Sequence, residues 1–244
     1  MRIEITALST LPEVRPGDDL AALICAAAER EQQRLDRTVI LAVAQKIVSK
    51  AEGAVVDLRG IEPSALAKSW AAEWGKDARL IELILRQSRR IVKMDRGVLI
   101  TETRRGFVCA NAGVDQSNTA SAHIATVLPE DPDASAERLR SALGCGAVLV
   151  TDTFGRPWRE GLVDVAIGVA GFAPLEDYRG STDRGGRTLS ATIIAVADQL
   201  AAAAGLSMRK SDGSPAVLIR GFECRAGEGS ARALIRAPEA DLFR

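Results

Sequence analysis

The chain has 244 residues, of which 47% are hydrophobic and 26% are charged, as in an ordinary soluble globular protein. Its 32 basic and 32 acidic residues cancel, which argues against general binding to nucleic acid or to a membrane surface. Because no apolar run reaches the roughly 18 residues of a membrane span and no signal peptide is evident, we predict a cytoplasmic protein whose 4 cysteines are free thiols.

The first half of the chain alternates predicted strands and helices. Residues 1–7 alternate apolar and polar side chains, which predicts a strand, and a turn-rich loop follows at 11–17. Asp18 or Asp19 then caps a helix. The apolar stripe of that helix consists of Leu20, Leu23, Ile24, Ala27 and Ala28. Further along, we expect strands at 38–44 and 97–103 and helices at 63–72 and 77–90.

The second half begins with a short apolar segment at 107–110 and a polar loop at 111–118. Asp131 and Pro132 start a helix that ends near Gly144. Residues 147–150 predict a buried strand that ends in Asp152 and Thr153, and the chain then turns through 155–157 at a sheet edge. The remaining predicted segments are an apolar stretch at 164–171, a helix at 190–204, a polar loop at 208–215 and a strand at 216–221.

This irregular alternation predicts an α+β or mixed α/β fold. We expect a single unit over residues 1–244, in which any second domain is an insertion. Standard nucleotide motifs are missing, since neither a P-loop nor a Gly-x-Gly-x-x-Gly after a strand occurs. The only histidine, His123, is interpreted as non-catalytic, which argues against a Ser-His-Asp triad or a zinc site.

Polar clusters follow several of the apolar strands. They are Lys46 with Lys50, Asp115 with Asn118, Asp152 and Thr153 with Arg156 and Arg159, and residues 209–213. Taken singly, each also fits a plain structural role, as solvated lysines, an Asx turn, a capped turn or a basic turn. Together they offer hard oxygen ligands for Mg²⁺ or Mn²⁺ and cations for a triphosphate. Such a set is typical of phosphoryl transfer, which depends on positioning and charge.

Longer segments around these clusters resemble the coenzyme F420-0:L-glutamate ligase (gamma-glutamyl ligase) family. They are residues 44–53, 108–118, 128–135, 152–161, 164–168 and 177–180, and the resemblance extends from Leu11 to about Gly221. It implies an α+β fold with an unusual mixed sheet and an intertwined homodimer. Some bacterial members have an additional nitroreductase-like C-terminal domain, which we do not expect here because the chain ends at Arg244.

The resemblance implies a GTP-dependent ligase that adds L-glutamate to the carboxylate of coenzyme F420-0, often followed by γ-linked glutamates. GTP would convert the carboxylate into an acyl phosphate, which the glutamate amine then attacks. One or two Mg²⁺ or Mn²⁺ ions are implied as cofactors, and K⁺ is a further candidate. Two alternatives stay open: a related ligase for another carboxylate-bearing cofactor, and a non-catalytic nucleotide-binding module. GTP versus ATP, Mg²⁺ versus Mn²⁺ and the number of glutamates also stay open.

The resemblance also assigns residues. The implied nucleotide contacts are Leu11, Pro12, Glu13, Val14, Gln45, Lys46, Lys50, Asn118, Met208, Arg209, Lys210, Ser211, Asp212, Gly213, Ser214 and Pro215. Asp115 and Asp152 match one metal site, and Thr153 matches a second. Many archaeal relatives have a glutamine ligand where Lys210 stands, so Lys210 either removes the second metal or replaces its charge. Arg156 and Arg159 are hypothesised to contact phosphate or the acidic tail of the substrate.

Overall fold

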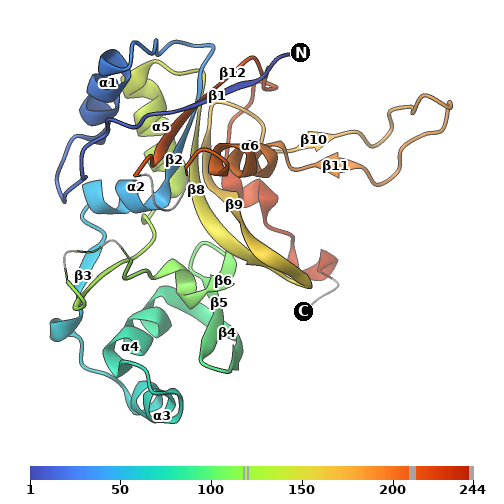
Figure 1. Cartoon of the computed structure of the whole chain (residues 1–244). Helices are drawn as coiled ribbons and strands as arrows, with labels where there is room; N and C mark the ends of the chain where they lie inside the picture. Colours follow the sequence, from blue (N-terminus) through green and yellow to red (C-terminus); the bar gives the residue numbers. More distant parts are fainter. Residues whose placement is uncertain (118, 120, 209–212, 242–244) are drawn as a thin grey trace.

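A five-stranded mixed sheet lies at the centre of the computed structural model, which describes residues 1–244 except 118, 120, 209–212 and 242–244 (Figure 1). In spatial order its strands are β1 (Glu4–Ala7), β12 (Ala216–Arg220), β2 (Ile40–Ala44), β8 (Ala147–Arg156) and β9 (Arg159–Ala170). Strands β2 and β8 run parallel, and the other neighbouring pairs run antiparallel. The predicted α+β class with a mixed sheet is therefore confirmed.

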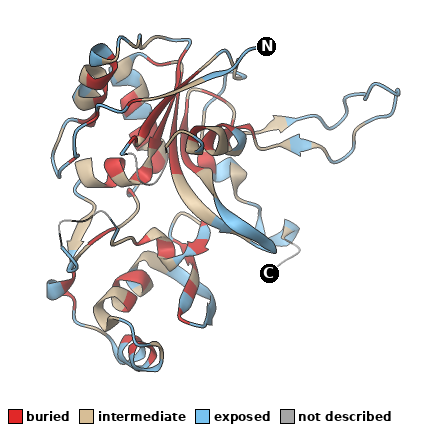
Figure 2. Cartoon of the chain, in the orientation of Figure 1, coloured by how far each residue is buried: buried red, intermediate tan, exposed pale blue. Residues whose placement is uncertain are grey.

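Helices cover this sheet and bury its central strands, which are red in Figure 2. They are α1 (Leu20–Arg30), α2 (Gln45–Ala51), α5 (Pro132–Leu143) and α6 (Val196–Gly205). The side chain of Asp19 caps α1 by accepting from the amide of Ala22, as predicted, and Asp131 caps α5 in the same way. Within the described part of the chain, no helix has the length and apolar character to cross a membrane.

A second hydrophobic cluster, distinct from that of the main sheet, is built from residues between 58 and 125. The elements of this part of the chain are β3 (Val55–Asp57), η1 (Leu58–Gly60), α3 (Ala65–Trp74), α4 (Ala78–Gln87), β4 (Ser88–Asp95), β5 (Val98–Thr103), β6 (Val108–Ala110), η2 (Asn111–Gly113) and β7 (Ile124–Thr126). Strands β4, β5 and β6 form their own sheet, and β3 pairs with β7. The division of residues 1–244 into one unit with an inserted part stays a prediction.

Three sequence-based boundaries were wrong. The helix predicted to reach Arg90 ends at Gln87, because residues 88–95 pair with β5 as a strand. The strand predicted to end at Asp152 and Thr153 continues to Arg156, because residues 151–156 pair with β9, and the turn predicted at 155–157 lies at Pro157 and Trp158. The helix predicted from residue 190 begins at Val196.

Residues 176–194 form an arm that projects from the body of the chain (Figure 1). Its base is a pair of short strands, β10 (Glu176–Asp177) and β11 (Ile193–Ile194). The C-terminal segment has two short 3-10 helices, η3 (Ala231–Leu234) and η4 (Pro238–Ala240).

The carboxylate of Asp133 joins α5 to β9 and to the C-terminal segment. Its Oδ1 accepts from the amides of Val169 and Ala231, both at 2.9 Å, and its Oδ2 accepts from the Ser230 hydroxyl at 2.7 Å. We predict that Asp133→Ala lowers the free energy of unfolding by about 2–4 kcal/mol, because several donors lose a charged acceptor at once.

Urea unfolding followed by circular dichroism measures this effect. The matched control is Glu137→Ala on the same helix, where an exposed ion pair with Arg140 is lost and the expected change is below about 1 kcal/mol. Equal effects for the two variants would contradict the anchoring role of Asp133.

Candidate functional site

Part of the polar clusters of the sequence analysis, namely Lys46 and Lys50 with Asp115 and Asp152, lies at the carboxyl ends of β2 and β8. These strands are parallel neighbours, and Ala44 lies opposite Thr151. Helix α2, which begins at Gln45, and Asp152 therefore follow the two strands at the same level of the sheet. Both ends of the 208–215 loop are anchored here. The amide of Ala44 donates to the carbonyl oxygen of Pro215 at 2.8 Å, and the Thr151 hydroxyl lies 3.7 Å from the Met208 sulfur. Between these anchors, Arg209, Lys210, Ser211 and Asp212 lie outside the described residues, as does Asn118.

The 11–14 loop reaches the same region through an ion pair. The Lys50 ammonium contacts the carboxylate of Glu13, and the Lys50 side chain is only 12% exposed while that of Glu13 is 71% exposed. Leu11 and Val14 point into the core. Pro12 and Glu13 of this loop are exposed, and their contact with a nucleotide stays a prediction. Lys50 is a largely buried, ion-paired cation rather than a solvated one.

Lys46 and Asp115 form the second ion pair of the site. The Lys46 Nζ lies 2.8 Å from Asp115 Oδ2 and donates to the Ser117 hydroxyl at 2.7 Å, and the amide of Ser117 donates to Asp115 Oδ1 at 2.6 Å. Burial alone would raise the pKa of Asp115, but the Lys46 and Ser117 hydrogen bonds outweigh it and hold this pKa below its ordinary value. Asp115 is therefore ionised at neutral pH, as a metal ligand must be.

We predict that Lys46→Met destabilises the fold by about 1 kcal/mol at pH 7, a modest value because the Asp115 carboxylate is more than a third exposed. The depressed pKa of Asp115 contributes stability that is present above its unfolded pKa and lost as the pH falls through the folded one. The difference between wild type and variant should therefore shrink toward acidic pH. Urea unfolding from pH 7 to pH 3 checks this, with Lys46→Arg as the charge-retaining control, and a difference independent of pH would contradict it.

A left-handed turn positions Asp115. Asn111 and Ala112 have φ angles of 55° and 53°, a conformation that is uncommon outside glycine, and Gly113 follows with a φ of 71°. At Gly113 an added Cβ would also lie 2.6 Å from Leu128. Asp115 then pairs through its main chain with Thr126. Such strained backbone persists only where the surroundings enforce it, and it occurs here beside the predicted site.

Asp152 and Thr153 are adjacent in β8 and, by the alternation of a strand, point to opposite faces of the sheet. Asp152 lies on the side of Cys109 in β6. Burial, and then the charge of Asp152, raise the pKa of Cys109 to about 12, so this residue is a neutral thiol. The Thr153 hydroxyl donates instead to Asp164 Oδ1 at 2.5 Å.

The oxygen donors present fit a hard divalent cation. Mg²⁺ is usually bound by one or two carboxylates and completes its shell with water and substrate phosphates, so Asp115 and Asp152 suffice as its protein ligands. Over the described ranges, no group of three or more His, Cys, Asp or Glu side chains gathers as a metal site. The donor set therefore matches a metal that arrives with a nucleotide rather than a metal held by the protein alone.

Other predicted site residues have local partners. Gln45 is buried, and its side-chain oxygen accepts from the Ser49 hydroxyl at 2.9 Å, which leaves its main chain for a ligand. Arg156 and Arg159 lie at the far end of the β8–β9 hairpin, about 13 Å along the strand from Asp152. Arg156 donates to main-chain oxygens of its own hairpin. Within this chain the two arginines are not brought to the Asp152 end, and their contact with a substrate stays a prediction.

Asp164 accepts from the hydroxyl of the predicted site residue Thr153, and the sequence analysis gave it no role. The sequence offered one indication, since Asp164 belongs to the 164–168 segment that resembles the ligase family. Its partnership with Thr153 depends on the continuation of β8 past that residue, which was not predicted.

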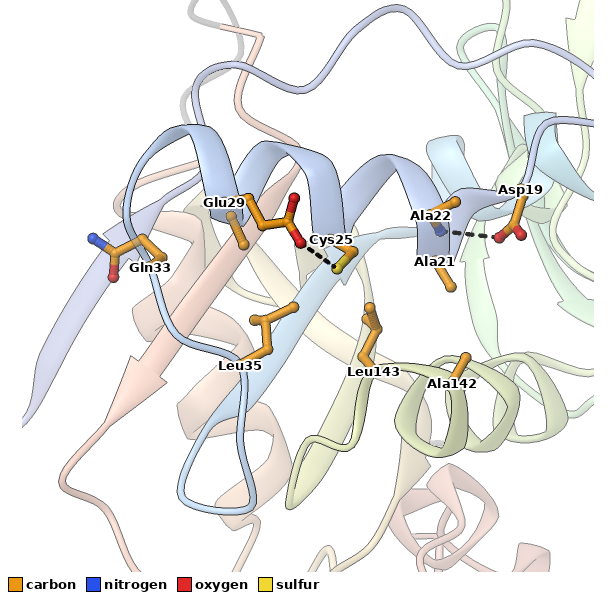
Figure 3. Close-up of a pocket in the computed structure, with 10 residues that line it drawn as sticks. Asp19, Ala21, Ala22, Cys25, Glu29, Gln33, Leu35, Ala142 and Leu143 are labelled. Atoms are coloured by element: carbon orange, nitrogen blue, oxygen red, sulfur yellow. Dashed lines mark hydrogen bonds between the residues drawn. The ribbon is translucent and has the colours of Figure 1, made fainter.

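A cavity of about 460 Å³ lies elsewhere, between α1 and α5 (Figure 3). Its lining is mainly alanine and leucine, with Cys25 and Glu29 in contact at 3.7 Å. Burial and the neighbouring Glu29 raise the pKa of the Cys25 thiol, so it is a poor nucleophile at neutral pH. Every described residue that lines this cavity lies outside the predicted site, so the candidate chemistry does not reside there.

Comparison with known proteins identifies the family of the chain. The family model described as F420-0:Gamma-glutamyl ligase matches residues 9–221. The chain is 49% identical to the coenzyme F420:L-glutamate ligase of Methanopyrus kandleri, over 100% of this chain and 98% of that protein. It is 45% identical to the protein of the same name from Methanothermobacter thermautotrophicus, over 100% of both chains, and 39% identical to that of Methanocaldococcus jannaschii, over 100% of this chain and 97% of that one. The chain therefore belongs to the F420-0:gamma-glutamyl ligase family.

Proposed function

We propose that this protein is a ligase that adds L-glutamate to coenzyme F420-0, with GTP and Mg²⁺ or Mn²⁺ as co-substrate and cofactor. The relatives that match it over its full length are coenzyme F420:L-glutamate ligases. The observation that supports the chemistry best is the meeting of Lys50, Lys46 with Asp115, and Asp152 at the carboxyl ends of β2 and β8. Cations and carboxylates at one sheet end suit a metal–nucleotide complex.

In this mechanism Asp115 and Asp152 would hold the divalent ion, which would supply positive charge to the phosphates. Lys46 and Lys50 neutralise the remaining phosphate charge and fix the nucleotide beside the acceptor. An oxygen of the F420-0 carboxylate attacks the γ-phosphorus, and the bond to GDP breaks. The glutamate nitrogen then attacks the acyl carbon of the resulting acyl phosphate, inorganic phosphate leaves, and the nitrogen loses a proton. Cys109 is excluded as a nucleophile because it is buried and neutral. A potassium ion at the phosphates stays a prediction.

One assay tests the proposed activity. The protein is incubated with GTP, Mn²⁺, L-glutamate and coenzyme F420-0, and the products are identified by mass spectrometry. GDP release with a mass gain of one or more glutamyl groups supports the ligase. Release of GDP only with a different carboxylate-bearing acceptor supports the related ligase, and nucleotide binding without turnover of any acceptor supports the non-catalytic module. Replacing GTP by ATP in the same assay decides the nucleotide.

The homodimer implied by the family resemblance is also a proposal. Two exposed features support it. The 176–194 arm projects from the body as a long hairpin, which is held together by the β10–β11 pair, a Thr182–Thr188 bridge and main-chain hydrogen bonds, and isolated hairpins are marginally stable. On β4, the apolar side chains of Ile91, Val92 and Met94 are each about two-fifths exposed. A mass of about twice the 25.9 kDa chain in light scattering would support the dimer, and a monomer at micromolar concentration would contradict it.

A further inference from the structure

Strand β9 has one extra residue where β8 reaches the candidate site. Val150 pairs with Gly168, but the next residue of β8, Thr151, pairs with Ala166, so that Ile167 is the additional residue of a β-bulge. Beyond this point the two strands are again paired one to one, displaced by one residue from the pairing before the bulge. A bulge bends its strand, increases the local twist and redirects nearby side chains, and bulges are common beside active sites.

The Asp198 carboxylate of α6 holds this bulge. Its Oδ1 accepts from the amide of Ala166 at 2.9 Å, and Ala166 and Ile167 are both buried. A buried amide needs a hydrogen-bond partner, and a bulge disturbs the strand pairing that would normally supply one. Asp198 supplies it from the first turn of α6. At the other end of the helix, an added Cβ on Gly205 would lie 2.1 Å from the Asp164 carboxylate, so α6 is packed closely on β9 at both ends.

The main chain just beyond the bulge sets the direction of the Asp152 carboxylate. The amide of Thr153 donates to Asp152 Oδ1 at 2.8 Å, so the carboxylate is held by the backbone of its own strand. Asp152 is paired with Val165, the neighbour of Ala166. If the pairing that precedes the bulge continued, Ala166 would instead lie opposite Asp152. The hydrogen bond from Ala166 to Asp198 therefore fixes the strand segment against which Asp152 is placed.

A second helix carboxylate on the same strand provides a comparison. Asp133 of α5 accepts from the amide of Val169 at 2.9 Å, and Val169 pairs with Leu149, on the side of the bulge away from Asp152. Strand β9 is thus attached to one helix before the bulge and to another after it. Both attachments stabilise the fold, but only that of Asp198 lies next to the residues that face Asp152.

We propose that Asp198 is a positioning residue of the ligase: by fixing the β9 bulge at Ala166, it sets the direction in which β8 presents the Asp152 carboxylate. This inference rests on the proposed function, which places Asp152 at the metal–nucleotide complex. It predicts that loss of the Asp198 side chain impairs the site, and that loss of the comparable Asp133 side chain impairs only the fold.

Metal binding tests the proposal without turnover. Mn²⁺ is titrated into the protein with GDP present, and free Mn²⁺ is followed by electron paramagnetic resonance. Asp198→Ala should weaken Mn²⁺ binding by about 10–100-fold, as for the loss of other residues that orient a metal ligand. Asp198→Asn should bind Mn²⁺ as the wild type does, because the asparagine oxygen can accept from the Ala166 amide. The matched control, Asp133→Ala, should lose stability and keep the wild-type affinity.

The outcomes separate positioning from general destabilisation. Unchanged Mn²⁺ affinity in Asp198→Ala would overturn the proposal, and so would equal weakening in Asp133→Ala. Should Asp198→Ala not fold, Asp198→Ser replaces it, since serine keeps a shorter acceptor, and wild-type affinity in that variant would equally contradict the proposal.

Wild-type measurements distinguish this inference from the proposed function. Absence of Mn²⁺ binding in the wild type would overturn the inference together with the metal assignment. Glutamate addition by the wild type, with unchanged Mn²⁺ affinity in Asp198→Ala, would support the proposed function and overturn the inference alone.

Discussion

Asp152→Asn is expected to lower kcat/KM for glutamate addition by at least about 100-fold, because it removes a negatively charged ligand from the proposed metal–nucleotide site. The substitution is nearly isosteric. Asp152 Oδ1 accepts the amide of Thr153 at 2.8 Å, and an asparagine oxygen can keep that bond, so the strand should remain intact. The loss should therefore appear in metal-dependent turnover and not in stability.

The measurement is steady-state glutamate addition at increasing Mn²⁺, together with urea unfolding of the same protein. Asp115→Asn should behave similarly, since both carboxylates belong to the same proposed position. Asp95→Asn, on the exposed end of β4, is the control and should retain full activity. Wild-type turnover of Asp152→Asn at saturating metal, with the fold preserved, would remove Asp152 from the site.

The sequence alone was sufficient to predict where α1 and α5 begin and where α5 ends, because capping residues and a glycine define these points locally. The cap of α1 was predicted at Asp18 or Asp19 and lies at Asp19, and the predicted start of α5 at Asp131 is confirmed. Gly144 ends α5 in the left-handed conformation that its residue type favours. The position of Lys46 and Asp152 after apolar strands could also be anticipated. That both strands end at the same level of the sheet follows only from the parallel pairing of β2 and β8, with Ala44 opposite Thr151.

The predictions that were wrong concern segments whose structure depends on contacts with distant parts of the chain. Residues 155–157 were predicted to form the turn, since Gly155 and Pro157 are turn-forming residues, yet pairing with 159–166 extends the strand to Arg156. The turn falls instead at Pro157 and Trp158, and Trp158 adopts a φ of 59° that its residue type does not favour. The same pairing brings Asp164 to Thr153. No local signal could assign Asp164 a role before the hairpin was known.

Gly168→Ala is expected to have the largest effect on stability, a loss of about 3 kcal/mol or more. Gly168 lies in β9 beneath the first turn of α5, and an added Cβ would be 2.3 Å from the carbonyl oxygen of Pro132 and 2.5 Å from its carbonyl carbon. Both are main-chain atoms of a proline at the start of a helix, so no side-chain rotation can relieve the overlap. The strand and α5 would have to separate.

Urea unfolding against Gly60→Ala measures this effect. At Gly60 no atom lies within 4 Å of an added Cβ, so the control should change the free energy of unfolding by less than about 0.5 kcal/mol. Separation of β9 from α5 would also stretch the 2.9 Å bond between the Val169 amide and Asp133, so Gly168→Ala and Asp133→Ala should be strongly non-additive. Equal stability of the two glycine variants would mean that α5 does not approach β9 this closely. The packing of β9 against α5, in the strand that pairs Asp164 with Thr153, would then be wrong.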